Sequence, residues 1–222
     1  MRKILSAQNI SKRYETPIKV EVLKKISLDV YEGQTLAITG KSGEGKSTLL
    51  HILGTLEKPT SGTLEICATS PTSHNVSQLR NRSIGFIFQS FNLLDNYTVL
   101  ENILMPAKIG RKDTSSKSPA YLGALSLLEE VGLLDRLHFP AKLLSGGEKQ
   151  RAAIARALCN DPDIIFADEP SGNLDHSHST LIHNLLIGSA KKRHKALIIV
   201  THDTELASMC DATYHLKDGQ LE

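Results

Sequence analysis

The sequence of 222 residues lacks the features that mark several classes of protein. Its three cysteines form no C-x-x-C pair, so the spacing indicates neither a disulfide framework nor a cysteine-based metal site. Its apolar runs, such as 196–200, are far shorter than the roughly 18 residues that a membrane-spanning helix needs. The formal net charge is only +2, which gives no strong attraction to nucleic acid or to anionic lipid. We therefore expect any role at a membrane to depend on a partner.

Most of the chain alternates between short apolar strand patterns and amphipathic helix patterns, which predicts an α/β fold. In the first third, strand patterns occur at 4–10, 20–30, 34–39, 63–67 and 84–88. In the last third, strands and helices alternate at 163–167, 178–191, 196–201, 204–210 and 212–216. Residues 70–77 are polar and predict a loop.

The middle of the chain carries helix signals instead. Thr98 and Glu101 form a capping box at the start of a helix that we expect Pro106 to end. Ser118 followed by proline marks a second helix start. We therefore predict a single domain with a helical insertion. The predicted bounds are 1–222 for the domain, 1–89 and 160–222 for its nucleotide-binding core, and 90–159 for the helical subdomain.

One segment matches the phosphate-loop pattern G-x-x-x-x-G-K-[ST] and lies between a predicted strand and a predicted helix. Its glycines let backbone N–H groups approach phosphates, Lys46 reaches the β- and γ-oxygens, and Ser47 can ligate Mg²⁺. An acidic side chain here would repel the nucleotide, so Glu44 is expected to point away from the phosphates. The predicted ATP-binding residues are Gly40, Lys41, Ser42, Gly43, Glu44, Gly45, Lys46, Ser47 and Thr48.

A second element completes the predicted metal site. The apolar strand pattern at 164–167 ends in two carboxylates, Asp168 and Glu169. We expect Asp168 to hold Mg²⁺ through water, and Glu169 to activate or orient the attacking water. A strand followed by two surface carboxylates is common by itself, so this interpretation depends on the phosphate loop upstream.

A second glycine-rich motif, Leu-Ser-Gly-Gly-Glu-Lys-Gln-Arg at 144–151, opens another predicted helix. Its serine, bare glycine backbone and helix start make a second anion site. Lys46 already serves the chain's own nucleotide, so this site is expected to meet the γ-phosphate held by another copy. The motif thus predicts two ATP molecules held head to tail between two copies. The residues assigned to it are Ser145, Gly146, Gly147 and Glu148.

With these motifs in this order, the sequence resembles ABC-type ATPase subunits from end to end. The resemblance implies a P-loop, RecA-like core with an N-terminal antiparallel β subdomain and a helical insertion. It assigns Tyr14 to adenine stacking, and Gln89 to the Q-loop that contributes to the Mg²⁺ site. It also assigns Asp175 to the D-loop at the dimer crossing and His202 to contact with the γ-phosphate. The catalytic residues implied are Lys46, Glu169 and His202, and the metal ligands are Ser47, Gln89 and Asp168.

Within that family, four segments resemble a group that works in lipoprotein release, macrolide export and cell division. These segments are 47–54, 85–89, 98–102 and 167–175. Segments 51–54 and 198–203 are most similar to the lipoprotein-releasing ATPases. The resemblance implies ATP and Mg²⁺ as cofactors and a homodimer at the cytoplasmic face of the inner membrane. The dimer is expected to drive separate membrane subunits through a coupling helix near Gln89–Leu94, with no nucleic acid involved.

Alternative functions remain open from the sequence. A cell-division-type ATPase would send a regulatory signal without moving a substrate, and a macrolide-efflux ATPase would serve another cargo. Soluble ABC ATPases of DNA repair or translation are disfavoured, because no long coiled-coil insertion or second ATPase unit is visible.

Overall fold

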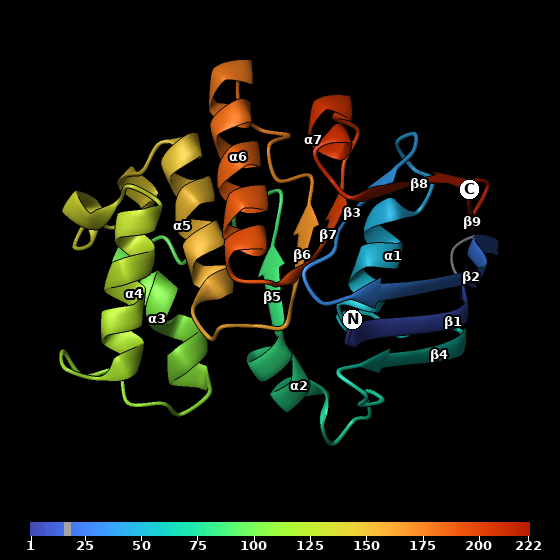
Figure 1. The fold of residues 1–222 in the computed structure, drawn as a ribbon, viewed down its shortest axis with the longest axis horizontal. Helices are drawn as coiled ribbons and strands as arrows, with labels where there is room; N and C mark the ends of the chain where they lie inside the picture. Colours follow the sequence, from blue (N-terminus) through green and yellow to red (C-terminus); the bar gives the residue numbers. More distant parts are fainter. Residues whose placement is uncertain (16–18) are drawn as a thin grey trace.

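The computed structural model describes residues 1–15 and 19–222, which form two sheets flanked by helices (Figure 1). The larger sheet has six strands in the order β5-β6-β7-β3-β8-β9. Its neighbours from β5 to β8 pair in parallel, and β9 pairs antiparallel with β8. The strands are β3 (Thr35–Thr39), β5 (Ile84–Ile87), β6 (Ile164–Asp168), β7 (Ala196–Val200), β8 (Ala212–Lys217) and β9 (Gln220–Leu221).

A smaller antiparallel sheet has the order β2-β1-β4. It consists of β1 (Lys3–Tyr14), β2 (Val20–Tyr31) and β4 (Ser61–Ile66). Its inward side chains share one apolar cluster with helix α1 (Lys46–Leu53) and with Phe166 of β6. The predicted antiparallel β subdomain is confirmed, and it covers α1 and one face of the parallel sheet.

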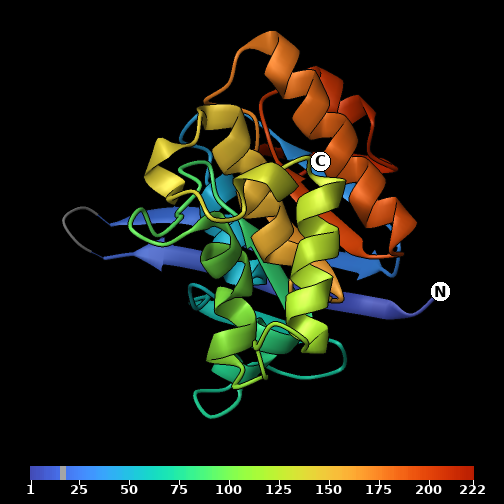
Figure 2. The same cartoon turned by 90° about the vertical axis from the view of Figure 1, so that its left-hand side faces the viewer.

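Three helices gather at the other end of the molecule, which faces the viewer in Figure 2. These are α3 (Val99–Ile109), α4 (Pro119–Glu130) and α5 (Gly146–Leu158). Together with α6 (His176–Lys192), they form a second apolar cluster that includes Ile165 and Leu197 of the sheet. Successive strand residues point to opposite faces, so Phe166 lies in the first cluster and its neighbour Ile165 lies in the second. Short helices α2 (Val76–Ser83) and α7 (Thr204–Ser208) complete the fold.

Two sequence predictions were wrong in detail. Helix α3 does not end at Pro106 but continues to Ile109, because proline near a helix end removes only one intrahelical bond. The carbonyl of Pro106 still accepts hydrogen bonds from the Gly110 N–H (3.0 Å) and from Asn81 Nδ2 (2.8 Å). Helix α2 begins inside the segment predicted as a loop. Leu79 is its one buried residue, so no apolar period marks it in the sequence.

Glu130 connects the helical segment to α6 at the end of α4. Its carboxylate accepts hydrogen bonds from Ser189 Oγ at 2.7 Å and from Arg193 Nη2 at 2.6 Å. Burial would raise the pKa of Glu130, but the hydrogen bonds and positive charge of these partners outweigh it and lower the pKa. The charged form of Glu130 is therefore stabilised in the folded protein.

Replacing this carboxylate should destabilise the fold in a pH-dependent way. Glu130→Gln should lower the free energy of unfolding at pH 7 by about 1–3 kcal/mol, the range for hydrogen bonds to charged groups. The folded-state pKa lies below the ordinary value of 4.5, so the contribution is present above that pH and is lost as pH falls through the lowered pKa. Urea unfolding at pH 7 and pH 3 should show the difference shrinking. A difference independent of pH, or an equal effect of Glu129→Gln at the exposed neighbour, would contradict this account.

Candidate nucleotide-binding site

A cleft of about 630 Å³ opens where loops leave the carboxyl ends of the parallel strands. The loops after β3, β5, β6 and β7 all reach it, because parallel strands deliver their ends to one edge of a sheet. Residues far apart in sequence therefore meet there. The lining residues are Val22, Ser42, Gly43, Gly45, Lys46, Ser47, Thr48, Gln89, Glu169 and His202.

The phosphate loop is shaped by backbone conformations that suit glycine. Gly45 has a φ of 95°, and an added Cβ would lie 2.5 Å from Cγ1 of Val22. Lys46 is almost fully buried, and its Nζ donates to the carbonyl oxygens of Gly40 (2.8 Å) and Lys41 (2.9 Å). Helix α1 starts directly behind the loop, and the first N–H groups of a helix have no partner within it. Loop and helix start together form a backbone anion site.

Glu44 turns back along the loop. Its Oε2 accepts the N–H of Lys41 at 3.0 Å, and Glu44 is not among the residues that line the cleft. Gly40 and Lys41 also lie outside the lining. The expectation that the Glu44 carboxylate points away from the phosphates agrees with this contact.

Ser47 and Asp168 are brought together from α1 and β6. Ser47 Oγ donates to Asp168 Oδ1 at 3.0 Å, and His51 Nε2 lies 3.8 Å from Asp168 Oδ2. Burial raises the pKa of Asp168, and the hydrogen bond from Ser47 and the proximity of His51 only partly oppose this. A hydroxyl and a carboxylate oxygen are hard donors of the kind that Mg²⁺ prefers, so this pair fits a divalent cation.

Glu169 and His202, which both line the cleft, contact each other. Glu169 has a φ of 44°, a left-handed conformation uncommon for a residue with a side chain. Its N–H donates to the Val200 carbonyl at 2.9 Å, which fixes the start of the loop after β6. Glu169 Oε2 lies 2.9 Å from His202 Nδ1 and accepts the Thr201 hydroxyl at 3.3 Å. The carboxylate is thus held at the cleft by two groups from the loop after β7.

Tyr14 lies beside the site rather than in the cleft lining. Its hydroxyl donates to Glu57 at 2.8 Å, and Lys12 Nζ lies 5.0 Å from the centre of its ring. The ring remains partly exposed at the end of β1. The structure therefore leaves Tyr14 outside the group of residues that meet in the cleft.

The second glycine motif also lies outside this cleft. Ser145 Oγ accepts the N–H of Glu148 at 3.3 Å, and Glu148 Oε2 accepts the N–H of Ser145 at 2.8 Å, and together these bonds form a capping box at the start of α5. Gly147 is so close to α6 that an added Cβ would lie 3.1 Å from His178 Cδ2. Asp175 is the N-cap of α6, and hydrogen bonds from the backbone and side chain of His178 lower the pKa of Asp175 to about 2.

Sequence reasoning missed three residues near the site. Val22 lines the cleft from β2, His51 lies against Asp168, and His183 contacts the loops after β6 and β7. No local motif marks any of them. In the sequence, His51 and His183 are merely histidines within predicted helices, and His183 occupies an apolar position of α6. Val22 is one apolar residue of a predicted strand.

This geometry defines a P-loop nucleotide-binding ATPase. Residues 23–172, more than half of the chain, match the family model described as ABC transporter, and the chain belongs to this family. The predicted fold class and the predicted ATPase activity are confirmed. Among the described residues, 1–15 and 19–222, no helix is both long and apolar enough to span a bilayer.

Curated relatives match almost the whole chain. The lipoprotein-releasing system ATP-binding protein LolD of Protochlamydia amoebophila (strain UWE25) is 56% identical over 218 residues, covering 98% of this chain and 96% of that protein. The protein of the same name from Shewanella frigidimarina (strain NCIMB 400) is 46% identical over 224 residues, covering 99% and 92%.

Solved structures agree with this assignment. The dimeric structure of MJ0796, a bacterial ABC transporter cassette, matches with a TM-score of 0.88 and 36% identity, covering 99% of this chain and 97% of that one. A dimeric post-hydrolysis state of the MJ0796 cassette bound to ADP and Pi matches with a TM-score of 0.88 and 35% identity, over the same shares of the two chains.

The orientation of Glu44 can be tested by removing its charge. In Glu44→Gln the amide oxygen can still accept the Lys41 N–H, so the loop keeps its contact. Because the carboxylate points away, the Kd for ATP should change by less than about threefold, as expected for a half-buried charge that solvent still screens. Fluorescent nucleotide binding measures this, with Lys46→Ala as the variant that weakens binding. An affinity gain above tenfold would mean that the carboxylate of Glu44 reaches the phosphates.

Proposed function

We propose that the chain is the ATP-hydrolysing subunit of an ABC transporter that releases lipoproteins from a membrane. One observation carries the ATPase part: the phosphate loop, Gln89, Glu169 and His202 meet in a single cleft although they come from four loops. The cargo is supported by relatives of up to 56% identity that are named lipoprotein-releasing system ATP-binding proteins.

Each side chain has a role that follows from its place. The backbone of 40–48 binds the phosphates, and Lys46 neutralises their charge. Glu169 orients or activates the attacking water, while His202 contacts the γ-phosphate. Tyr14 lies outside the cleft lining, and its proposed role in stacking on the adenine comes from the resemblance to the family. Mg²⁺ supplies charge neutralisation at the phosphates, and the residues that hold it are Ser47, Gln89 and Asp168.

The complete site requires two copies arranged head to tail. In one chain, the motif at 145–148 lies outside the cleft that holds the phosphate loop, so it is available to the nucleotide of a partner. Asp175 lies at the crossing between the copies. The similar MJ0796 cassette is described as dimeric, which supports this arrangement.

The membrane subunits are proposed to dock in a groove of about 450 Å³ where α2, β5, α3 and α5 meet. Phe88, directly before Gln89, lines it together with the exposed residues Leu56 and Ile109. Leu93 instead packs on the interior cluster. A coupling helix in this groove would lie next to Gln89–Leu94 and place the complex at the cytoplasmic face of the inner membrane.

Removing the proposed catalytic carboxylate should separate binding from hydrolysis. Glu169→Gln should lower kcat by at least about a hundredfold, the usual contribution of a general base. Because it still binds Mg-ATP, it should accumulate as a dimer, measured by light scattering after size exclusion. Lys46→Ala, which lacks the phosphate-binding cation, should stay monomeric under the same conditions. A monomeric Glu169→Gln protein in Mg-ATP would contradict the head-to-tail model.

Charging the proposed docking groove should uncouple transport from hydrolysis. The double variant Leu56→Glu and Ile109→Glu changes two side chains that are 43% and 68% exposed, so the fold should tolerate it. Basal ATPase activity should stay within about twofold, since surface changes away from a site have small effects. Lipoproteins should remain in the inner membrane when this variant replaces the natural chain.

The matched control is Leu122→Glu, an exposed leucine on α4 outside the groove. It should leave lipoprotein release unchanged. Normal release by the groove variant would refute the docking site, and normal lipoprotein localisation after depletion of the wild-type chain would refute the proposed cargo.

A further inference from the structure

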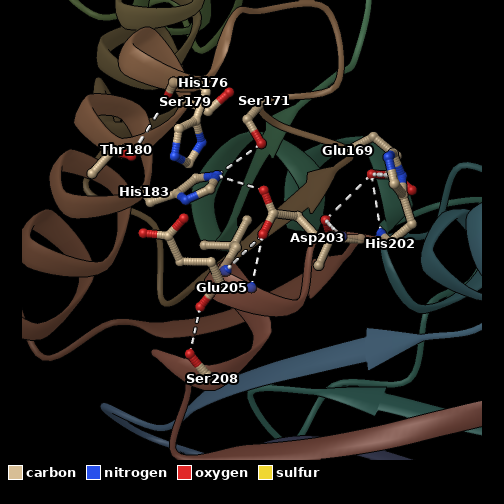
Figure 3. A network of polar contacts seen from close by, with 12 residues as sticks. Glu169, Ser171, His176, Ser179, Thr180, His183, His202, Asp203, Glu205 and Ser208 are labelled. Carbon is tan, nitrogen blue, oxygen red and sulfur yellow. Dashed lines mark hydrogen bonds and ion pairs between the residues drawn. The ribbon is translucent and has the colours of Figure 1, made fainter.

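A buried histidine lies at the centre of the polar network in Figure 3. His183 of α6 is only 1% exposed. Its Nε2 lies 2.8 Å from Ser171 Oγ and 3.6 Å from Asp203 Oδ2, whereas its Nδ1 has no hydrogen-bond partner. An unpaired buried nitrogen costs stability, and a purely apolar ring at this place would avoid the cost. The contacts of Nε2 therefore need an explanation.

The surroundings determine the form of the ring. Burial lowers the pKa of His183, and the negative charges of Asp203 and Glu205 only partly oppose this, so the neutral form is favoured. The carboxylate near Nε2 favours placing the single ring hydrogen on that nitrogen. Nε2–H then faces Ser171 and Asp203 together, and the lone pair of Nδ1 is left unpaired.

On one side the network continues to the proposed catalytic pair. The N–H of Asp203 donates to Thr201 Oγ1 at 3.0 Å, and the Thr201 hydroxyl donates to Glu169 Oε2 at 3.3 Å. The same carboxylate oxygen lies 2.9 Å from His202 Nδ1. A shift of Asp203 would therefore move the groups that hold Glu169.

On the other side the network continues toward Gln89. Ser171 begins the segment 171–175. In that segment, Asn173 Nδ2 donates to the Gln89 carbonyl at 3.0 Å. A Cβ on Gly172 would lie 3.3 Å from Gln89 Nε2 and 3.5 Å from Glu169 Cβ. The position of Ser171 therefore sets how this segment packs on two proposed site residues.

We propose that His183 is a positioning residue for ATP hydrolysis. It joins segment 171–175 to segment 201–203 and thereby keeps Glu169 and His202 in their hydrolytic arrangement. It makes no contact with substrate. The inference rests on the proposed roles of Glu169 and His202, and it adds a connection between the dimer-crossing segment and the catalytic carboxylate.

A metal ion is the competing explanation, because donor atoms of His183, Asp203 and Glu205 lie within 4.8 Å of one another. Hydrogen bonds already engage two of these groups, Asp203 and His183. Asp203 Oδ1 accepts two backbone N–H groups at the start of α7, and Nε2 of the histidine contacts Ser171. A metal-binding histidine normally donates its other N–H to an acceptor, and Nδ1 has none. The geometry therefore favours the hydrogen-bonded connection.

The test measures ATPase rates of the 222-residue chain over a range of Mg-ATP concentrations up to saturation. His183→Phe keeps an aromatic side chain and removes both nitrogens, and it should lower kcat about tenfold while KM for ATP changes less than about twofold, as expected when catalytic groups are displaced. Ser171→Ala should have a similar effect. Because His183→Phe already removes the contact that Ser171→Ala removes, the double variant should lose no more activity than His183→Phe alone. Ser171→Thr, which keeps the hydroxyl, should retain the wild-type kcat.

His183→Gln is the rescue variant, since its amide nitrogen can reach the place of Nε2; its kcat should lie within about threefold of wild type. A purely structural role would lower the Tm of His183→Phe but leave the kcat of the folded enzyme unchanged, and that result would overturn the inference. So would Zn²⁺ raising the Tm of the wild type and not of His183→Phe. If Glu169→Gln keeps the wild-type turnover, the proposed function itself fails. If Glu169→Gln is inactive and His183→Phe has a normal kcat, only the inference about His183 fails.

Discussion

The placement of unpaired backbone N–H groups at the carboxyl edge of the parallel sheet is the constraint on which the site depends. A triphosphate carries several negative charges in a small volume, and side-chain cations alone could not surround it. The loop before α1 meets this need with backbone, so its conformations are restricted: Gly45 fits against Val22 because it has no side chain. The same restriction turns Glu44 back onto the Lys41 N–H.

The start of α5 has the features of a second backbone anion site, which the proposed two-copy enzyme requires. The capping box of α5 uses the acceptor capacity of the Ser145 hydroxyl, because Oγ accepts the Glu148 N–H. The hydrogen of that hydroxyl remains available for donation. Glu148 meanwhile is bound to the Ser145 backbone, which keeps its carboxylate in a fixed place. The helix start can thus be rigid within its own chain and still offer donors to a phosphate held by another.

The parts of the site that were predictable from the sequence are those whose chemistry lies in consecutive residues. The phosphate loop, the Asp168–Glu169 pair and the capped start of α5 each need a local pattern that short-range sequence rules describe. His183 has no such pattern. It is one histidine in an apolar stripe, and its partners Ser171 and Asp203 lie on loops that only the folded sheet brings together.

The fold shows the same division between local and tertiary information. Strands β6 and β7 of the parallel sheet were predictable because each is an almost continuous, buried apolar run. Helix α2 was not, since its sequence is polar and Leu79 alone is buried. Asn81, a residue of α2, donates to the carbonyl of Pro106 in α3, so the two mispredicted elements are in contact. The missed start of α2 and the misplaced end of α3 therefore concern the same contact region.

The packing around Gly172 bears on how a membrane event could reach the nucleotide. Gln89 lies next to the proposed docking groove, and a Cβ added to Gly172 would touch both Gln89 and Glu169. Close-packed groups transmit displacement because no free volume absorbs it. A movement of the Q-loop must then be shared by segment 171–175, which also leads to the expected dimer crossing at Asp175. The proposed docking groove, the proposed dimer crossing and the proposed catalytic carboxylate therefore border one packed unit, and this packing offers a direct physical connection between them.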